Sequence, residues 1–513
     1  MNSTYLRRPP VRIGFGLIAL LLAATCVFAQ GGYYINGPLR TLPDATFNEA
    51  AIPLFVPVNR EDVKAIGMGK TQVANGLTFN AMMYNPALLA TPKTSIEAFT
   101  VQASIPPQTL DAALYFKDHI GEFRQALSLT KVKDAAKNLS AAGATLAQML
   151  AALQDIQDGM RFPRDLLTTV VGPSENPKTH GFRVIPAVSA QIGNFGFSLF
   201  GTVQSGFQVI QSATLDALLK VKIPPNLNDQ TQINAAVQAA ADLLTILNAV
   251  TDPITGTINI KEAYPVTFSV SHIDIVGAAG YGYRLTKNID LGANIKIINR
   301  RFSTKIVQTN NVDDIWSEVR GDFDASATGF TFDLGGRYHF DFGLDAGLSL
   351  QNIIPVQKIT STVSGTFVAS GYDYDLDNLG RKQINGVGDT AVVPVAQRQT
   401  IHQPIDLKLP FIMNAGTRYA ITREWDVAFD IADIAAQDER FENYGQRFRL
   451  GTEYRLDAIK DVLGIAPRLG YADSRLTFGV GLNLFRFIQI DGAYAVDSFI
   501  QERSYFAQLR IGW

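Results

Sequence analysis

Apolar and polar residues alternate along many segments of the chain, and the last ten residues, 504–513, show this clearly. Their odd positions carry apolar side chains, whereas their even positions are mainly polar or small. The apolar set is Tyr505, Ala507, Leu509, Ile511 and Trp513, and the other set includes Ser504, Gln508, Arg510 and Gly512. A period of two residues predicts a β-strand that has one apolar and one polar face.

The polar faces of these segments predict a lumen rather than a dry core. In the segment 446–457 the same alternation turns Arg447, Arg449, Glu453 and Arg455 to one side. Burying four charges between packed sheets costs several kcal/mol each unless they are paired. A water-filled or polar-lined lumen removes this cost. The alternative is a soluble antiparallel sheet, which would need solvent on its polar face and a partner layer on its apolar face.

Strands of this kind recur along the chain, and their length of about ten residues suits a tilted strand that crosses a bilayer. We expect strands at 95–104, 182–192, 194–206, 268–285, 288–306, 328–340, 342–356, 406–421, 423–436, 446–457, 465–474, 475–484, 485–496 and 503–513. An even number of strands is usual in bacterial barrels. The predicted fold is therefore all-β, a fourteen-stranded antiparallel transmembrane barrel.

The links between these strands differ in length. Those after the first, third, fifth and seventh strands are long, and those after the second, fourth, sixth and eighth are very short. Outer-membrane barrels have short periplasmic turns and long external loops, so both termini are expected in the periplasm. The links at about 105–181 and 207–267 carry Ala- and Leu-rich helical patterns. We expect these extracellular helices over the barrel mouth; a separate soluble domain is the alternative.

The first 29 residues resemble a secretory signal peptide, with Arg7, Arg8 and Arg12 before an apolar run and Ala29 at its end. We divide the chain into a signal peptide at 1–29, an N-terminal segment and hatch at 30–93, and the barrel at 94–513. No later stretch of 18 apolar residues predicts a membrane helix. The expected location is the outer membrane of a Gram-negative bacterium.

Composition agrees with a chain whose surface faces lipid. Apolar residues make up 47% of the chain and charged residues 18%, with 42 glycines, and soluble domains usually have about 25% charged residues. Loss of the three leader arginines takes the net charge from −2 to −5, so nucleic acid is not an expected partner. The five His residues are scattered. We expect no metal, no cofactor, no catalytic residue and no enzymatic activity.

A compact segment at 63–90 precedes the first strand. Gly67 and Gly69 can supply turns, and Asn85 can cap a short helix that begins at Pro86. The barrel interior is the natural place for it.

This segment also carries a resemblance. Its stretch GMGKTQVANGLTFNAMMYNPALLA resembles the start of the FadL/TodX superfamily of outer-membrane transporters, and looks closest to TraF-like and PorV-like members. The resemblance implies fourteen strands around an N-terminal hatch formed in part by Gly67, Met68, Gly69, Asn85, Pro86 and Ala87. It also implies that barrel-assembly machinery recognises the final strand through Tyr505, Leu509, Ile511 and Trp513.

The alternation further predicts a set of charges that line the lumen: Arg284, Asp333, Arg337, Arg447, Arg449, Glu453, Arg455 and Arg510. Two functions fit the whole pattern. One is passive uptake of hydrophobic small molecules, with outer-membrane lipid and a hydrophobic ligand as partners. The other is a non-transporting platform for a secretion or conjugation apparatus, with a protein of that apparatus as partner. An apolar pocket or wall opening beside residues 63–90 would favour uptake, and a sealed, charge-packed lumen would favour the platform.

Overall fold

The structure is a computed structural model that describes most of the chain from residue 60 to residue 512. The described residues are 60–75, 80–126, 129–172, 178–210, 217–218, 220–249, 251, 266–308, 319–353, 360–367, 372–375, 380–383, 400–406, 411–435, 444–460, 462–485, 487–500 and 502–512. The predicted signal peptide and Trp513 lie outside these ranges.

Long strands dominate the described chain, with helices before β1 and in the links that follow β1 and β3, and a 3₁₀ turn before β14. The strands are β1 (Lys93–Ile105), β2 (Thr179–Gly193), β3 (Phe195–Ile210), β4 (Val266–Arg284), β5 (Ile289–Gln308), β6 (Val319–His339), β7 (Leu344–Gln351), β8 (Thr360–Phe367), β9 (Tyr372–Asp375), β10 (Gly380–Gln383), β11 (Thr400–Asp406), β12 (Ile412–Ala420), β13 (Trp425–Ile431), β14 (Phe448–Tyr454), β15 (Leu456–Ile459), β16 (Leu463–Ala472), β17 (Arg475–Leu484), β18 (Ile488–Val496) and β19 (Arg503–Gly512). The helices are α2 (Val63–Gly67), α3 (Ala81–Tyr84), η2 (Pro86–Ala90), α4 (Pro107–Ala126), α5 (Thr130–Ser140), α6 (Leu146–Leu166), η3 (Leu167–Val171), α8 (Gln230–Ala249) and η7 (Tyr444–Arg447).

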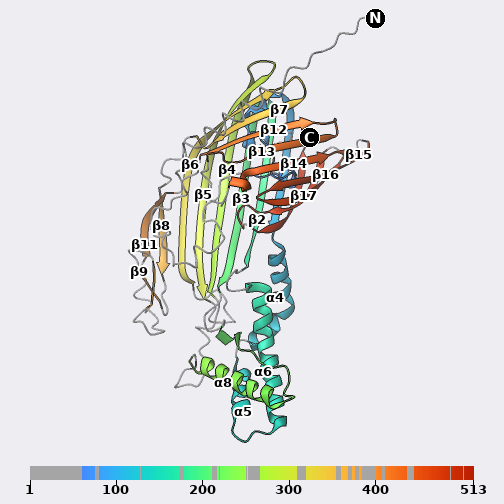
Figure 1. Cartoon of the computed structure of the whole chain (residues 1–513). Helices are drawn as coiled ribbons and strands as arrows, with labels where there is room; N and C mark the ends of the chain where they lie inside the picture. Colours follow the sequence, from blue (N-terminus) through green and yellow to red (C-terminus); the bar gives the residue numbers. More distant parts are fainter. Residues whose placement is uncertain are drawn as a thin grey trace.

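The large sheet closes on itself. Its first strand, β1, pairs antiparallel with β2 on one side and with the last strand, β19, on the other. Seventeen stretches belong to this sheet. Three pairs of them (β7 with β8, β11 with β12, and β14 with β15) each continue one strand of the wall, which gives 17 − 3 = 14 strands. The predicted closed, fourteen-stranded antiparallel barrel is confirmed (Figure 1).

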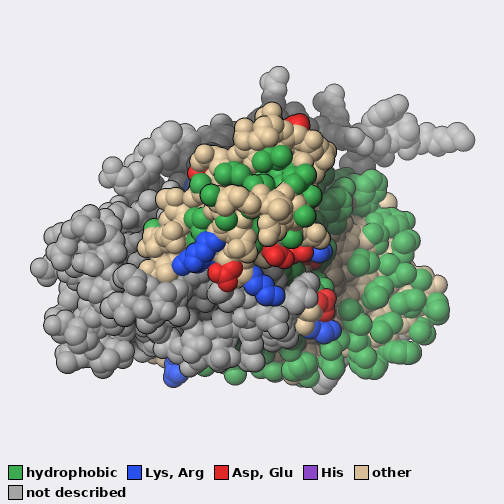
Figure 2. Space-filling view, turned by 90° about the horizontal axis from the view of Figure 1, so that it is seen from below, with side chains coloured by type: hydrophobic (Ala, Val, Ile, Leu, Met, Phe, Trp, Pro, Cys, Tyr) green, Lys and Arg blue, Asp and Glu red, His purple; other side chains and the backbone are tan. Residues whose placement is uncertain are grey.

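The two faces of the wall differ as the alternation predicts. Along β19, Tyr505, Leu509 and Ile511 are exposed on the outside, whereas Gln508 and Arg510 are buried inside. Apolar side chains cover the outer wall where it is visible in Figure 2. A closed sheet with an apolar outer face and a polar inner face is the arrangement of a membrane-spanning barrel. None of the helices in the described ranges is long and apolar enough to cross a membrane.

Short links gather at one end of the barrel, among them 285–288, 340–343 and 421–424. Exposed aromatic side chains, including Tyr283, Phe342 and Trp425, lie at this short-link end. Some predicted boundaries differ from the structure. In the predicted strand 342–356, β7 ends at Gln351, and the predicted strand 406–421 is interrupted at residue 411. The predicted strand 446–457 begins at Phe448 because residues 444–447 form the 3₁₀ turn η7.

The helices between β1 and β4 form a unit at the opposite end. α4 starts at the barrel, where the side chain of Gln108 donates to the carbonyl oxygen of Thr179 over 3.1 Å. A 20-residue helix is about 30 Å long, and α5, α6 and α8 lie beyond the barrel (Figure 1). Their shared core includes Val132, Leu139, Ile156, Met160, Leu243 and Leu247. The predicted helices are present, but α5, α6 and α8 bury their apolar faces against one another rather than over the barrel mouth.

Because the barrel closes between β1 and β19, we predict that assembly in the membrane requires the last strand. Deleting residues 503–513 would leave the edges of β1 and β18 unpaired in lipid, where each unsatisfied backbone group costs several kcal/mol. We expect such a chain to show no heat-modifiable band on an unboiled gel of outer membranes. Trp513→Phe keeps a terminal aromatic residue and should assemble normally. Normal assembly of the deleted chain would contradict the closed seam between β1 and β19.

Candidate functional site: the barrel interior and its inner segment

Residues 60–75 and 80–90, named here the inner segment, lie inside the barrel. Nearly all of their described side chains are buried. Asp62 caps α2, since its Oδ1 accepts the backbone N–H of Lys64 at 3.0 Å. Asn85 caps η2 in the same way, with Oδ1 accepting the N–H of Ala87 at 3.0 Å, and Pro86 occupies the first turn. These caps satisfy amide groups that water cannot reach.

The six residues predicted for the hatch fall into two groups at opposite sides of the inner segment. Gly67, Met68 and Gly69 form the turn that ends α2, and the N–H of Gly69 donates to the Thr477 hydroxyl at 3.0 Å. The second group is Asn85, Pro86 and Ala87. The Asn85 amide nitrogen donates to the carbonyl oxygen of Val73 at 2.9 Å and to that of Gly336 on β6 at 3.1 Å. Both groups therefore fix the inner segment to the wall.

Glycines on the inner wall let the backbone of the inner segment approach the strands closely. A Cβ added to Gly470 on β16 would lie 2.1 Å from the nitrogen of Gly69, and one added to Gly292 on β5 would lie 2.2 Å from the carbonyl carbon of Pro86. The wall contributes several more such contacts, at Gly282, Gly335, Gly347, Gly451 and Gly479. Backbone therefore packs on backbone over much of the inner circumference, which leaves no space for a side chain at these positions.

This packing gives a sharp mutational contrast. Gly470→Ala would force the inner segment or β16 to move, and overpacking of this kind costs about 1–3 kcal/mol of unfolding free energy. Gly336→Ala is the matched control, because a Cβ there meets no atom within 4 Å. Urea unfolding in detergent micelles, followed by loss of the heat-modifiable band, measures both. Equal stability of the two variants would show that the inner segment is not seated as described.

Charged side chains make a second set of contacts between the inner segment and the wall. Lys64 binds Glu453 on β14 at 2.8 Å, and the same carboxylate binds Arg468 on β16 at 2.7 Å. Arg468 also reaches Asp491 on β18 at 2.6 Å. Lys70 binds Asp473 at 2.7 Å. The inner segment thus places Lys64 and Lys70 against carboxylates from two parts of the barrel wall, β14 and the link between β16 and β17.

The structure places all eight predicted lumen charges on the inner side of the wall, but in separate clusters. Arg284 and Arg337 meet at the short-link end, and Asp333 binds Lys296 at 2.8 Å. Arg447 reaches Asp433 at 3.0 Å from η7. Arg455 binds Asp426 at 2.7 Å, and the guanidinium of Arg449 lies 3.5 Å from the carbonyl oxygen of Lys70. Glu453 and Arg510 belong to the contacts of the inner segment.

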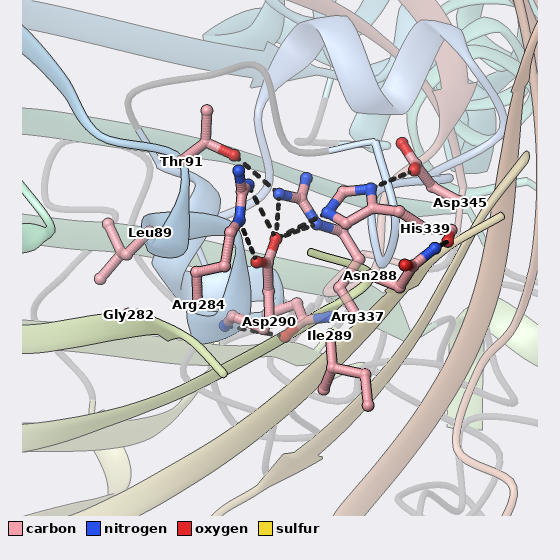
Figure 3. Close-up of polar contacts among 12 residues, drawn as sticks. Leu89, Thr91, Gly282, Arg284, Asn288, Ile289, Asp290, Arg337, His339 and Asp345 are labelled. Atoms are coloured by element: carbon pink, nitrogen blue, oxygen red, sulfur yellow. Dashed lines mark hydrogen bonds and ion pairs between the residues drawn. The ribbon is translucent and has the colours of Figure 1, made fainter. Parts of the chain in front are cut away.

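Asp290 is the centre of the cluster at the short-link end (Figure 3). Its buried carboxylate accepts from Arg284 at 2.8 Å, from Arg337 at 2.7 Å and from His339 at 2.7 Å. Arg337 also donates to the Thr91 hydroxyl at 2.7 Å. The cluster thereby connects β4, β5 and β6 to the residues that lead from the inner segment into β1.

Removing this shared carboxylate should destabilise the barrel. Asp290→Asn would leave three donors facing an amide, and loss of one partner from a buried pair costs about 3–5 kcal/mol. We expect a lower urea midpoint in micelles. Asp457→Asn, on the exposed strand β15, is the control and should change the midpoint little. An unchanged midpoint in Asp290→Asn would show that the cluster does not hold the wall.

Several residues that hold the inner segment were not predicted from the sequence. Arg60, Asp62, Lys64 and Glu97 carry no motif, and only their charge in an otherwise apolar region is a signal. Asp430 accepts the backbone N–H groups of residues 72 and 73 at 2.6 and 3.0 Å. Burial, together with the nearby Asp62 carboxylate, raises the pKa of Tyr84. Its neutral hydroxyl accepts the N–H of Asp62 at 2.6 Å.

A small cavity lies beside the inner segment, among the residues that the structure describes. This cavity of about 60 Å³ lies between the inner segment and the strands β12, β13 and β14, with Gln72, Gln351, Asp430 and Arg449 among its lining residues. The side-chain amide of Gln72 makes no hydrogen bond there. This space suits a few water molecules, and is far smaller than the roughly 300–1,000 Å³ of sites that bind drug-sized ligands.

A larger apolar space lies on the outside of the wall. This recess has a volume of about 550 Å³ and crosses β1 to β5. Small outward residues form it, and large apolar residues surround them. The small residues are Ala98, Ala190, Gly277 and Ala279, and the large ones are Val188, Phe197, Leu199, Ile295 and Ile297. Glu97, Ser189 and Ser198, which face the interior, also line the recess.

The recess coincides with an irregularity in β1. The register against both β2 and β19 shifts by one residue just after Glu97, and Ala98 and Phe99 are both exposed. A bulge of this kind bends a strand and redirects its side chains. Here it leaves Glu97 pointing inward, where Arg60 binds it at 2.7 Å. One patch of wall therefore carries the recess outside and an ion pair of the inner segment inside.

Neither a protein-family model nor a curated protein matches the sequence. Among solved structures, the chain is similar to the Pseudomonas putida toluene transporter TodX, with 12% identity, a TM-score of 0.41 and coverage of 89% of this chain and 97% of that one. A Pseudomonas aeruginosa FadL homologue gives 11% identity, a TM-score of 0.38 and coverage of 89% and 96%. The CymD monoaromatic hydrocarbon channel gives 9% identity, a TM-score of 0.40 and coverage of 89% of this chain and 97% of that one.

Proposed function

We propose that this barrel provides a passive path for hydrophobic small molecules across the outer membrane. The observation that carries the proposal is the apolar recess in the lipid-facing wall. Its volume of about 550 Å³ lies within the range of sites for small organic molecules. A hydrophobic molecule that crosses the wall from the interior to the recess would enter the bilayer without crossing water. The path needs no energy source, because the molecule moves down its own gradient.

The arrangement of the interior supports a route through the wall. The inner segment is packed backbone to backbone against wall glycines and is tied to strands by ion pairs. A straight path along the barrel axis would have to break these contacts. A route that turns outward at the β1 bulge would have to break mainly the contacts of Glu97.

The proposed setting follows from the two ends of the barrel. With the short-link end in the periplasm, both the entry into β1 and the end of β19 lie on the periplasmic side, and the helical unit extends outside the cell. Outer-membrane lipid then surrounds the apolar wall, and barrel-assembly machinery receives β19 from the periplasm. A leader at residues 1–29 would direct export.

A platform for a secretion or conjugation apparatus is the second candidate, and the helical unit favours it. This unit has its own core and stands away from the barrel. In Figure 2 its outer end carries apolar and uncharged polar side chains, with charges gathered along one side. Leu146 and Leu150 of α6 are exposed in this unit. Such a surface suits a protein partner better than a small molecule.

Filling the recess tests the uptake proposal. Gly277→Phe would put a ring into the recess, since a Cβ at Gly277 meets no atom within 4 Å. We expect a several-fold lower uptake rate of a labelled long-chain fatty acid or monoaromatic hydrocarbon. Uptake is measured in cells that lack their own transporters for these compounds. The matched control, Gly336→Phe, adds the same ring to another open position on the outer wall. Cells with this variant should take up the probe at the normal rate.

The same cells separate the two candidates. Wild-type uptake no faster than that of cells with an empty vector would overturn the uptake proposal. The platform would then be established by a protein that co-purifies in stoichiometric amount from outer membranes. This protein should no longer co-purify with the double variant Leu146→Asp, Leu150→Asp.

A further inference from the structure

The first three described residues of the inner segment all contact the place where the barrel closes. Arg60, Glu61 and Asp62 lie next to the seam between β1 and β19. This seam joins the two ends of the barrel sequence, and no covalent link supports it. The other described hairpin partners are held together by the chain that connects them.

Arg60 binds the β1 side of the seam. Its two terminal nitrogens donate to the two oxygens of Glu97 at 2.7 and 2.5 Å, and one of them also donates to the Ser189 hydroxyl on β2 at 2.9 Å. The side chains of Arg60 and Glu97 are almost completely buried. The pair is therefore little screened by solvent, and its geometry is bidentate, as in the stronger class of ion pair.

Asp62 binds the β19 side of the seam. Its Oδ2 accepts from Arg510, and the Nε of the same guanidinium donates to Glu97 at 3.0 Å across the seam. The other carboxylate oxygen of Asp62 caps α2, so the side chain is held from both sides. Val63 extends this contact, since its N–H donates to the Gln508 side chain on β19 at 2.9 Å.

Glu61 makes a second crossing nearer the helical end. Its carboxylate accepts from Arg183 on β2 at 3.4 Å and from the Ser498 hydroxyl at 3.1 Å, in the link between β18 and β19. Asp497 in the same link binds Arg183 at 3.2 Å and accepts from the Ser104 hydroxyl on β1 at 2.7 Å. Successive residues of the inner segment thus contact opposite sides of the seam.

The seam needs such support because β1 is irregular there. The one-residue bulge after Glu97 breaks the ladder toward both β2 and β19, and a bulge leaves backbone groups unpaired and increases local twist. Arg60 and Arg510, the partner of Asp62, both bind Glu97 at the bulge itself.

We propose that residues 60–62 form a closure bracket, an intramolecular template that holds the first and last strands in register while the barrel closes. The inner segment would then act in assembly, in addition to any part it has in uptake. The strands β1 and β19 lie more than 400 residues apart in the sequence. Bringing them together costs loop-closure entropy before any residue pair forms across the seam. A bracket that binds both strands supplies contacts at that stage and selects one register of the seam.

Refolding kinetics test the bracket. The protein is expressed without residues 1–29, unfolded in urea and refolded into phospholipid vesicles, and the heat-modifiable band is followed with time. Asp62→Asn keeps a capping side chain but loses the charge that binds Arg510. We expect a several-fold slower appearance of the folded band. Glu61→Gln, a milder change at the second crossing, provides the same comparison should Asp62→Asn fail to fold.

Lys64→Gln is the matched control, because it also removes a buried ion pair of the inner segment, to Glu453 on β14, away from the seam. It should speed unfolding and leave the folding rate near that of the wild type. An equal slowing of folding in Lys64→Gln and Asp62→Asn would overturn the proposal, as would normal folding of Asp62→Asn and Glu61→Gln.

A disulfide across the seam gives a readout that general destabilisation would not move. Ala103 and Ala507 are register partners on β1 and β19, and both face outward. Cys26 is the only native cysteine, so Ala103→Cys with Ala507→Cys supplies the only thiols of the shortened chain. Oxidised before refolding, this pair should restore the folding rate of Asp62→Asn and leave the unfolding rate of Lys64→Gln unchanged. No restoration in Asp62→Asn would show that seam closure is not the step the bracket assists.

Discussion

Pairing of every backbone amide and carbonyl group within the wall is the constraint on which the whole structure depends. Lipid offers no hydrogen bonds, so a sheet can cross it only when its first and last strands meet. The antiparallel ladder between β1 and β19 meets this requirement. Closure then fixes the chemistry of both faces: apolar side chains must point outward into lipid, and polar side chains collect inside. The alternation of apolar and polar residues along β19 follows directly from this geometry.

Closure also creates an interior that the wall cannot fill by itself. Small barrels of about eight strands pack their own side chains, but the diameter grows with strand number. Here the inner segment occupies the space, and the wall provides glycines where its backbone lies closest. Buried ion pairs contribute little net stability, yet breaking one is costly. The pairs of Lys64 and Lys70 with wall carboxylates therefore specify position more than they add stability.

The sequence predicted the wall well and the interior poorly, for a physical reason. Outward positions face one uniform solvent, lipid, so each strand must repeat the same apolar pattern, and fourteen strands could be counted from it. Inward positions face particular partners. Asp62 and Arg510, for example, are in contact although 448 residues separate them in the sequence. No local pattern reports such a pair. The bulge at Ala98 and Phe99 was not predicted for a related reason, because it shifts the alternation of apolar and polar residues within one strand. The helices were visible from their periodicity, but their packing against one another depends on contacts between two separate links.

The contacts that hold the inner segment differ between the glycine positions and the β1 bulge. At the glycine contacts, displacement of the inner segment would open voids along several strands at once, and interiors packed at this density do not deform gradually. At the β1 bulge Glu97 itself lines the recess, and the ladder there is already interrupted. A change at that patch needs the rearrangement of a few side chains. The bulge at which Arg60 and Arg510 contact Glu97 is therefore also the place where, on the proposed route, the wall would open at least cost. The two proposals, closure assisted by Arg60 and Asp62 and passage at the recess, would place opposite demands on one carboxylate, Glu97.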